Sequence, residues 1–540
     1  MESRSVRTTR RSAAPRRSLL WLALAAAAGG AQAGPGTVAI KTDGDITATF
    51  GAQVRLIPTT ERNWDFGIAR ATGNAAFKAH ANEGGIIKDS YIRTEDRLYF
   101  NFAKGDVWDV YMALEFDSNF MQQRVDRARS TQGPFGDFGL ERLNASLKLP
   151  AIGGRFNAGW DVYGVDTETG LIYTDDDPGF YLKGATGAFD WQAGFHKKVD
   201  GDYVVAAPVP AGSDNDRNIY TARINFKTGQ ASQIGLIYAL DDLNVRGGLV
   251  SAATTPNVAN NRLSAIAKST LGAFRLLGQG VYSFGKAEAT GVTNASSPDG
   301  SYDIRAFAFA GDIAYDLHKS WSLGTPVVPH FGFYYASGDK DPTDRRLGGY
   351  TAIVSIPRFG QIFGGENTFL YDGSAVAGSV LYGNLPELHG NQSPLLGVGG
   401  LTGTGRGDNP GLLQIGGGVT VGPWKSGGFF RAATYRTNAY LLRWNRNFIP
   451  AATPPAQLGA GTLGAYTVGT ALVTERTLGL EWDNELVLEV EKNTFLRLQA
   501  SVLAPRSGGR AAAASLAGVA NTGQFDKTAV RVAAEMLWNF

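Results

Sequence analysis

Residues 528–540 read TAVRVAAEMLWNF, and this stretch decides the fold. Every second residue from Val530 to Trp538 is apolar, whereas the residues between them include Arg531 and Glu535. Successive side chains of a β-strand point to opposite faces, so the stretch predicts a strand with one apolar and one mostly polar face. A half-buried strand of a soluble protein has the same alternation, and the distinguishing feature is the aromatic residue Phe540 that follows.

This ending resembles the closing strand of a bacterial outer-membrane β-barrel. In such barrels a terminal aromatic residue after alternating apolar residues resembles the signal read by the barrel assembly machinery, a role that the resemblance implies for Trp538 and Phe540. The strand is expected to close a barrel by pairing with the first strand, near residues 45–56. The apolar set would then meet lipid, and Arg531 and Glu535 would meet the lumen.

The composition excludes several classes of protein. The 540 residues include 70 Gly, 20 Tyr and only 4 Met. Outside the N-terminal region no stretch of about 18 apolar residues could form a transmembrane helix, which excludes a helical membrane protein. The absence of Cys excludes disulfides, thiolate metal sites and covalently attached haem. A barrel with polar-in and apolar-out strands is expected to look soluble in composition.

Residues 1–33 have the parts of a secretion signal. An Arg-rich start precedes an apolar run at 19–28, and Ala31-Gln32-Ala33 predicts cleavage after Ala33. Residues 34–540 are expected to form one barrel domain. Cleavage would remove six Arg and one Glu, so the net charge would change from +2 to −3. No dense Lys/Arg stripe remains, which argues against a nucleic-acid partner.

The clearest hairpin spans residues 97–117. Leu98, Phe100 and Phe102 alternate with polar residues, 104–106 (KGD) predicts a turn, and large apolar residues then alternate from Trp108 to Phe116. The same pattern recurs, in stretches of about nine to eleven residues that suit a tilted membrane strand. Further strands are expected at 142–149, 155–162, 189–196, 220–227, 234–240, 272–284, 303–315, 328–337, 412–421, 429–439, 472–483, 485–490 and 495–503.

The spacing of these stretches predicts a transmembrane antiparallel β-barrel of about 18 strands, within a range of about 16 to 20. Short Gly/Asp/Asn turns alternate with long Gly/Pro/Ser-rich stretches, as periplasmic turns and external loops do. The longest interruption, 338–411, has two interpretations. It either folds into the lumen as a constriction or forms an external loop with a short hairpin around 351–356 (TAIVSI).

Charged residues on the predicted polar faces are the candidate lumen and selectivity residues. One interpretation is a positive track that selects anions. The other is that these arginines pair with carboxylates on neighbouring strands and keep the wall hydrated. The candidates are Arg97, Glu115, Asp117, Arg142, Lys148, Arg155, Arg223, Arg275, Arg305, Arg431, Arg497 and Arg531.

Residues 334–344 read YYASGDKDPTD, which resembles the strand-to-loop transition of alginate-export-type outer-membrane porins. This resemblance implies an 18-stranded barrel with a polar, partly cationic lumen for an acidic polysaccharide or another anion. The acidic residues Asp339, Asp341 and Asp344 lack the full calcium-loop pattern and are interpreted as a solvated turn. Residues 175–177 (DDD) are interpreted as an acidic external loop.

The prediction is therefore an outer-membrane porin of a Gram-negative bacterium that admits small hydrophilic solutes, with anions or acidic saccharides as the expected class. No enzymatic activity, metal or cofactor is expected, because the five scattered His residues form no catalytic motif. Expected partners are outer-membrane lipid, lipopolysaccharide, the assembly machinery and two further copies in a homotrimer. The alternatives are a barrel that sheaths a partner such as a multihaem cytochrome, and a soluble propeller, whose repeat the sequence lacks.

Overall fold

The computed structural model of the protein describes residues 38–41, 45–63, 88–119, 137–199, 214–229, 231–246, 257–288, 295–341, 343–353, 411–446, 448–450, 470–472, 475–511 and 522–540. The predicted secretion signal at 1–33 and most of the long interruption, 354–410, lie outside these ranges. No helix among the described residues is both long and apolar enough to span a membrane.

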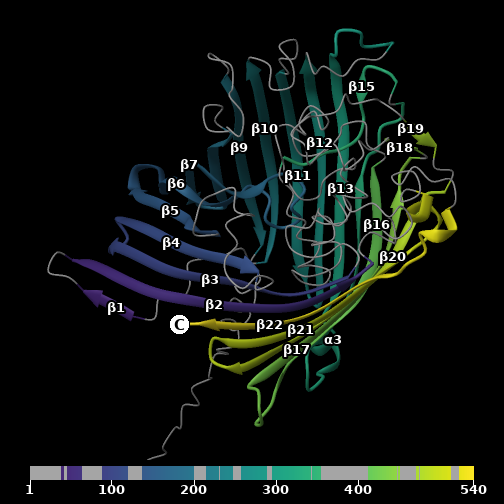
Figure 1. Cartoon of the computed structure of the whole chain (residues 1–540). Helices are drawn as coiled ribbons and strands as arrows, with labels where there is room; N and C mark the ends of the chain where they lie inside the picture. The colour runs from purple at the N-terminus through teal and green to yellow at the C-terminus, as the bar shows by residue number, and fades with distance from the viewer. Residues whose placement is uncertain are drawn as a thin grey trace, which may run out of the picture.

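Eighteen antiparallel strands form one closed barrel, which confirms the predicted fold class and strand number (Figure 1). Each strand pairs with its neighbour in chain order around the wall. The strands are β2 (Ile46–Arg62), β3 (Lys88–Lys104), β4 (Trp108–Asn119), β5 (Asp137–Leu149), β6 (Gly154–Gly164), β7 (Thr174–Thr186), β8 (Phe189–Val199), β9 (Asp214–Gly229), β10 (Ser232–Arg246), β11 (Asn257–Leu271), β12 (Phe274–Glu288), β13 (Tyr302–Tyr315), β14 (Val327–Ala336), β16 (Leu412–Lys425), β17 (Ala432–Trp444), β20 (Thr477–Glu491), β21 (Thr494–Pro505) and β22 (Ala529–Asn539).

Several short elements accompany the eighteen strands of the wall. The strand β1 (Val38–Lys41) pairs with β2, and β15 (Arg346–Leu347) pairs in parallel with β13. A separate two-stranded sheet joins β18 (Phe448–Pro450) and β19 (Thr470–Leu472). Short helical elements among the described residues include η2 (Pro150–Ile152), α3 (Leu317–Trp321) and η5 (Thr522–Gln524).

The seam of the barrel lies between β2 and β22, as the sequence predicts. Their register runs from the pair Gln53 and Asn539 to the pair Arg62 and Val530. Phe540 extends the pairing, because its backbone N–H and C=O both bond to Ala52, at 2.9 and 2.6 Å. Figure 1 shows the C-terminus at this seam. Pairing at the seam leaves no open sheet edge in the wall, which a membrane-spanning sheet requires.

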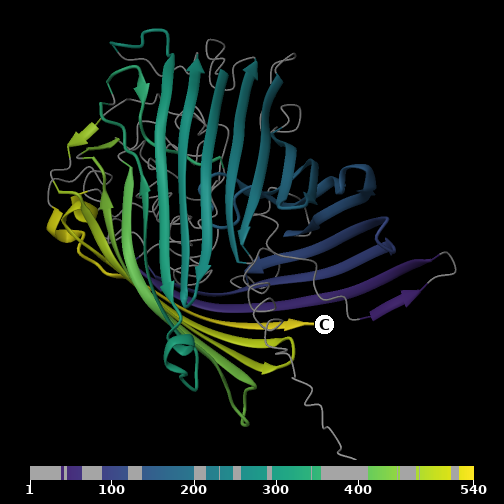
Figure 2. The same cartoon turned by 180° about the vertical axis from the view of Figure 1, so that it is seen from behind.

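The outer face of the wall is apolar and the inner face is polar. Figure 2 shows the side on which β10 to β13 stand side by side. Exposed on the outside are Leu98, Phe102, Leu143, Leu147, Trp160, Phe180, Ile224, Leu236, Phe307, Phe333, Trp482 and Val532. Buried on the inside are Asn144, Asn157, Thr221, Asn260, Gln279, Asn438, Gln499, Arg531 and Glu535. This distribution confirms the two faces predicted for β22 and is that of a barrel in the outer membrane of a Gram-negative bacterium.

One end of the barrel carries short turns. Gly105 and Gly153 have φ of 53° and 59°, a left-handed conformation that favours glycine; Gly105 begins the β3–β4 turn and Gly153 ends the β5–β6 turn. The other ends of the strands lie at the opposite end of the barrel. In outer-membrane barrels the short turns face the periplasm, so these other strand ends face outward.

Several expected boundaries are wrong. The wall strands have 10 to 17 residues and not nine to eleven, because polar ends such as Asp214 and Asn244 continue the pairing beyond the apolar belt. The strands expected at 472–483 and 485–490 are one strand, β20. Residues 175–177 lie in β7 and not in an external loop, and Lys198 forms ion pairs with Asp175 and Asp177.

Candidate functional site

The connection between β6 and β7, residues 165–173, folds into the barrel as a compact turn. Backbone bonds from Val165 and Asp166 to the carbonyl of Tyr173, at 3.1 and 3.4 Å, bring its two ends together. The Asp166 carboxylate accepts hydrogen bonds from the backbone N–H groups of Thr169 at 3.2 Å and Leu171 at 2.7 Å. An Asp side chain that bonds to the backbone ahead of it stabilises such turns locally.

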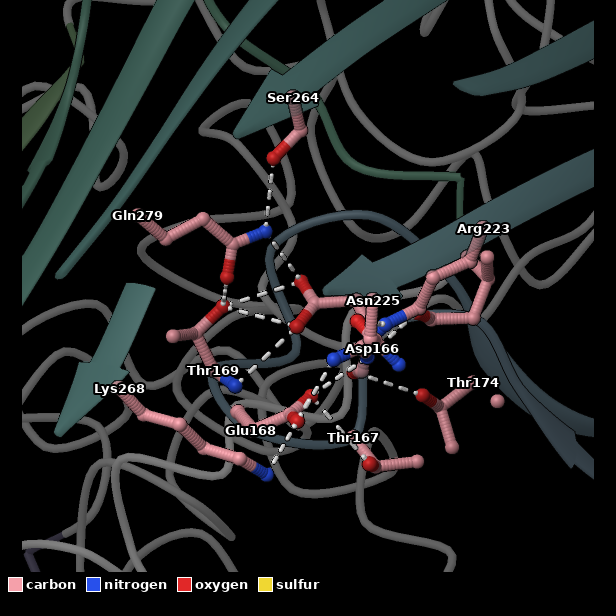
Figure 3. Close-up of polar contacts among 12 residues, drawn as sticks. Asp166, Thr167, Glu168, Thr169, Thr174, Arg223, Asn225, Ser264, Lys268 and Gln279 are labelled. Atoms are coloured by element: carbon pink, nitrogen blue, oxygen red, sulfur yellow. Dashed lines mark hydrogen bonds and ion pairs between the residues drawn. The ribbon is translucent and has the colours of Figure 1, made fainter. Parts of the chain in front are cut away.

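The turn is fastened to strand β12 of the wall through Asp166. Figure 3 shows Gln279 of β12 directed at this carboxylate, with Nε2 donating to Asp166 Oδ2 at 3.1 Å. The same Nε2 donates to Ser264 Oγ of β11 at 3.1 Å, and Thr169 Oγ1 bonds to Gln279 Oε1. Asp166, Thr169 and Gln279 are all buried. Buried polar groups that satisfy one another in this way hold two segments in a single arrangement.

Glu168 provides the second fastening of the same turn. Its carboxylate accepts from Arg223 of β9 at 2.7 and 2.8 Å and from Lys268 of β11 at 3.1 Å. Arg223 also donates to the carbonyl of Val165 at 3.0 Å and to Asn225 Oδ1 at 2.7 Å (Figure 3). One acidic residue of the turn therefore joins two strands of the wall by charge-assisted bonds.

The pH dependence of this fastening follows from Glu168. Burial opposes its ionisation, but the bonds and charges of Arg223 and Lys268 outweigh burial and lower its pKa from 4.5 to about 2. A carboxyl with a lowered pKa in the folded state stabilises that state above its ordinary pKa, and the contribution is lost as the pH falls. Burial raises the pKa of the neighbouring Asp166, which has the opposite pH dependence.

We therefore expect the stability difference between the wild-type protein and the Glu168→Gln variant to depend on pH. The difference should be complete above pH 4.5 and should disappear as the pH approaches 2. The measurement is the temperature at which the folded gel band converts to the unfolded one after incubation at each pH. The charge of Glu168 also raises the pKa of Asp166, so the difference includes this smaller indirect contribution. A difference that persists at pH 2 would contradict the assignment.

A second segment lies against the first. Residues 350–353, from the connection between β14 and β16, reach the turn through two bonds: Tyr350 Oη donates to the carbonyl of Leu171 at 2.5 Å, and the N–H of Ile353 donates to the carbonyl of Ile172 at 2.9 Å. The described start of the long interruption therefore folds into the lumen, in agreement with the constriction interpretation. Its later residues, 354–410, lie outside the described ranges.

Two buried arginines of the wall hold this second segment. Arg262 of β11 donates to the carbonyl of Thr351 at 3.2 and 3.0 Å. Arg217 of β9 donates to the carbonyl of Ile353 at 3.2 Å and binds both oxygens of Asp241 of β10, at 2.8 and 2.9 Å. We refer to residues 165–173 and 350–353 together as the constriction.

The wall away from the constriction is an ion-pair network. Arg97 of β3 pairs with Glu95, Glu115 and Glu141, the last at 2.8 Å. Further around the wall, the ion pairs join Arg55 to Glu95 and Glu535, Arg497 to Glu485 and Glu535, and Arg436 to Glu485. These contacts support the second interpretation of the sequence, in which the wall arginines are neutralised by carboxylates on neighbouring strands.

The predicted lumen residues divide into four groups. The first faces the lumen: Arg97, Glu115, Arg142, Arg155, Arg223, Arg497 and Arg531. The second lies at the short-turn rim: Lys148, Arg275 and Arg431. Arg305 is a wrong prediction, because it shares the outer face of β13 with the exposed Phe307 and Phe309. The side chain of Asp117 lies outside the described part of the chain.

Apart from Arg223, the residues that build and fasten the constriction are not among the sequence candidates. Arg217 and Arg262 fall in stretches rich in Asn and Asp where no strand is predicted, and Asp166 and Glu168 fall between two predicted strands. The available signal was the Asp-x-x-Thr spacing of Asp166 and Thr169, which is typical of a capped turn. No group of three or more His, Cys, Asp or Glu side chains in the described ranges could hold a metal ion.

No protein-family model and no curated protein sequence matches the chain. Among solved structures it is similar to Pseudomonas aeruginosa OccK8 (OprE), at 10% identity and a TM-score of 0.45, covering 91% of this chain and 98% of that one. It is also similar to Wzi, an outer membrane protein involved in group 1 capsule assembly in Escherichia coli and a carbohydrate-binding β-barrel, at 12% identity, a TM-score of 0.43 and coverage of 91% and 84%. It is also similar to Pseudomonas putida OprB, at 9% identity and a TM-score of 0.39, covering 91% of this chain and 94% of that one. Likenesses this distant carry no argument about function.

Proposed function

We propose that the protein is an outer-membrane channel through which small hydrophilic solutes diffuse passively, with a preference for anions. The observation that carries the proposal is the constriction: two segments fastened inside a closed barrel narrow a lumen whose wall is polar and charged. Such a lumen sorts solutes by width and by local field, which needs neither a cofactor nor a chemical step. No enzymatic activity forms part of the proposal.

The anion preference has to come from cations that carboxylates leave unneutralised. Arg97, Arg223 and Arg497 are each paired, so their fields are largely cancelled within the wall. We therefore propose a weak preference for anions in place of a continuous positive track. An acidic saccharide remains a substrate proposal that rests on the resemblance at residues 334–344.

The alternative function, a sheath around a partner protein, is less compatible with the constriction. A threaded partner needs an open lumen, whereas residues 165–173 reach from β6 to β12 and residues 350–353 lie against them. A homotrimer and contacts with lipopolysaccharide and the assembly machinery remain predictions from the sequence.

Planar-bilayer recordings of the purified protein test the proposal. We expect discrete conductance steps and, in a KCl gradient, a reversal potential displaced modestly toward that of chloride, because few lumen cations are unpaired. Heat-unfolded protein at the same concentration is the control. Absence of steps would remove the channel proposal, and a reversal potential displaced toward that of potassium would remove the anion preference alone.

A further inference from the structure

A hollow of about 580 Å³ lies at the short-turn rim, between the β5–β6 and β7–β8 turns. Its basic lining residues are Lys148, Arg155 and Lys183, and its acidic ones are Asp106 and Asp190. Because the hollow lies at the mouth of the barrel, every solute that uses the channel passes its opening. Its charge therefore contributes directly to which ions enter or leave.

Most of these charges are already paired. Lys148 pairs with Asp106, and Arg155 pairs with Asp109, which lies deeper on β4. Asp190 pairs with Lys227 of β9 at 2.8 Å. These ion pairs join side chains that neighbour one another across the strands. Each carboxylate cancels much of the electric field of its cation.

Lys183 of β7 differs from the other cations of the hollow. It is exposed, and it forms no ion pair with any described residue. Its Nζ lies 5.5 Å from the centre of the Tyr181 ring. An aromatic face orients an ammonium group without supplying a counter-charge. Lys183 is therefore held in position with its charge available to a solute.

The surrounding rim is also basic. Four further cations at the short-turn end form no ion pair with described residues: Lys104, Arg275, Lys425 and Lys492. The carboxylates there that are likewise unpaired among described residues are Asp45, Glu489 and the terminal carboxylate of Phe540. The unpaired cations outnumber these acids, so the field at this mouth attracts anions before they reach the hollow.

We propose that the hollow is a binding site for small oxyanions, such as carboxylates and phosphate, and that Lys183 is its selectivity-determining residue. The proposal rests on the channel function and specifies its solute class. Lys183 supplies up to three donors to an oxyanion, and charge-assisted bonds of this kind are the stronger ones. A single exposed ammonium binds weakly enough for the anion to leave, which conduction requires.

The test compares Lys183→Gln with Lys183→Arg and with Lys492→Gln, which removes the same charge from a turn on the other side of the rim. Inorganic phosphate is the probe, measured as inhibition of chloride current in bilayers and as ³¹P line broadening with the protein in detergent. We expect Lys183→Gln to weaken phosphate binding about fivefold, the loss of one exposed charge contact, and Lys183→Arg to retain it. Heat-modifiable gel migration verifies that each variant is folded.

Two outcomes would overturn the proposal of an oxyanion-binding site in the hollow. Either Lys183→Gln leaves phosphate binding unchanged, or Lys492→Gln weakens it as much, in which case the rim as a whole and not the hollow holds the anion. The detergent measurement separates this inference from the proposed function. Phosphate binding without conductance would remove the channel and keep the site, whereas conductance without phosphate binding would do the reverse.

Discussion

Replacing Asp166 by Ala is expected to raise the single-channel conductance about twofold or more, because the inward turn loses the residue that folds and fastens it. The substitution removes acceptors for the N–H groups of Thr169 and Leu171 and for Nε2 of Gln279. Each buried donor left without a partner costs about 1–3 kcal/mol. The summed loss is comparable to the free energy that holds a short segment in place. The turn should therefore leave the lumen for part of the time.

Thr167→Ala is the matched control for this prediction. Thr167 is exposed in the same turn, and its hydroxyl only approaches Glu168, at 3.5 Å. The wild-type conductance should therefore be retained. Asp166→Asn keeps one acceptor oxygen and should give an intermediate value with more frequent switching between levels. If Asp166→Ala folds and conducts like the wild type, residues 165–173 do not limit the pore.

The sequence predicts the barrel because the information for it is local. A period of two repeated along the chain determines which residues face lipid, and the count of such stretches gives the strand number. The seam followed from the same reasoning, since the first and last strands of a closed barrel must pair. The Arg305 error came from β13, where the inner face is formed by Ala306, Ala308 and Ala310. With small apolar residues inside, the alternation does not show which face is the lumen face, and Arg305 is predicted as a lumen residue although it shares the outer face with Asp303.

The constriction could not be predicted in this way because its contacts are not local. Thr169 meets Gln279 from 110 positions away, and Tyr350 meets Leu171 across 179 positions. Such pairs depend on the register of several strands and on which connections turn inward. No alternation pattern encodes either, and the polar composition of 165–173 equally suits a loop in solvent.

Replacing Arg217, a wall residue that holds the constriction, by Ala is expected to lower the stability of the barrel strongly. Arg217 and Asp241 have side chains only 5% and 1% exposed and are joined by two parallel bonds. Removing one partner of a buried pair costs about 3–5 kcal/mol, and we expect about 3 kcal/mol here because Arg262 remains 4.0 Å from Asp241. The measurement is the midpoint temperature of the heat-modified gel shift. As a control, Lys227→Ala breaks an exposed pair with Asp190 and should cost at most about 1 kcal/mol.

The double variant Arg217→Met/Asp241→Leu separates two contributions of Arg217. Apolar side chains of similar size replace a buried ion pair at little cost. The midpoint temperature should therefore rise again, but only in part, because Arg262 lies 4.0 Å from Asp241 and loses this carboxylate. The hydrogen bond from Arg217 to the carbonyl of Ile353 does not return, and of the two wall arginines only Arg262 then holds residues 350–353. Conductance in the double variant should therefore stay above the wild-type value although the barrel has regained stability. If the midpoint temperature rises and the conductance also returns to the wild-type value, Arg217 stabilises the wall only. The bond to Ile353 would then contribute nothing measurable to the constriction.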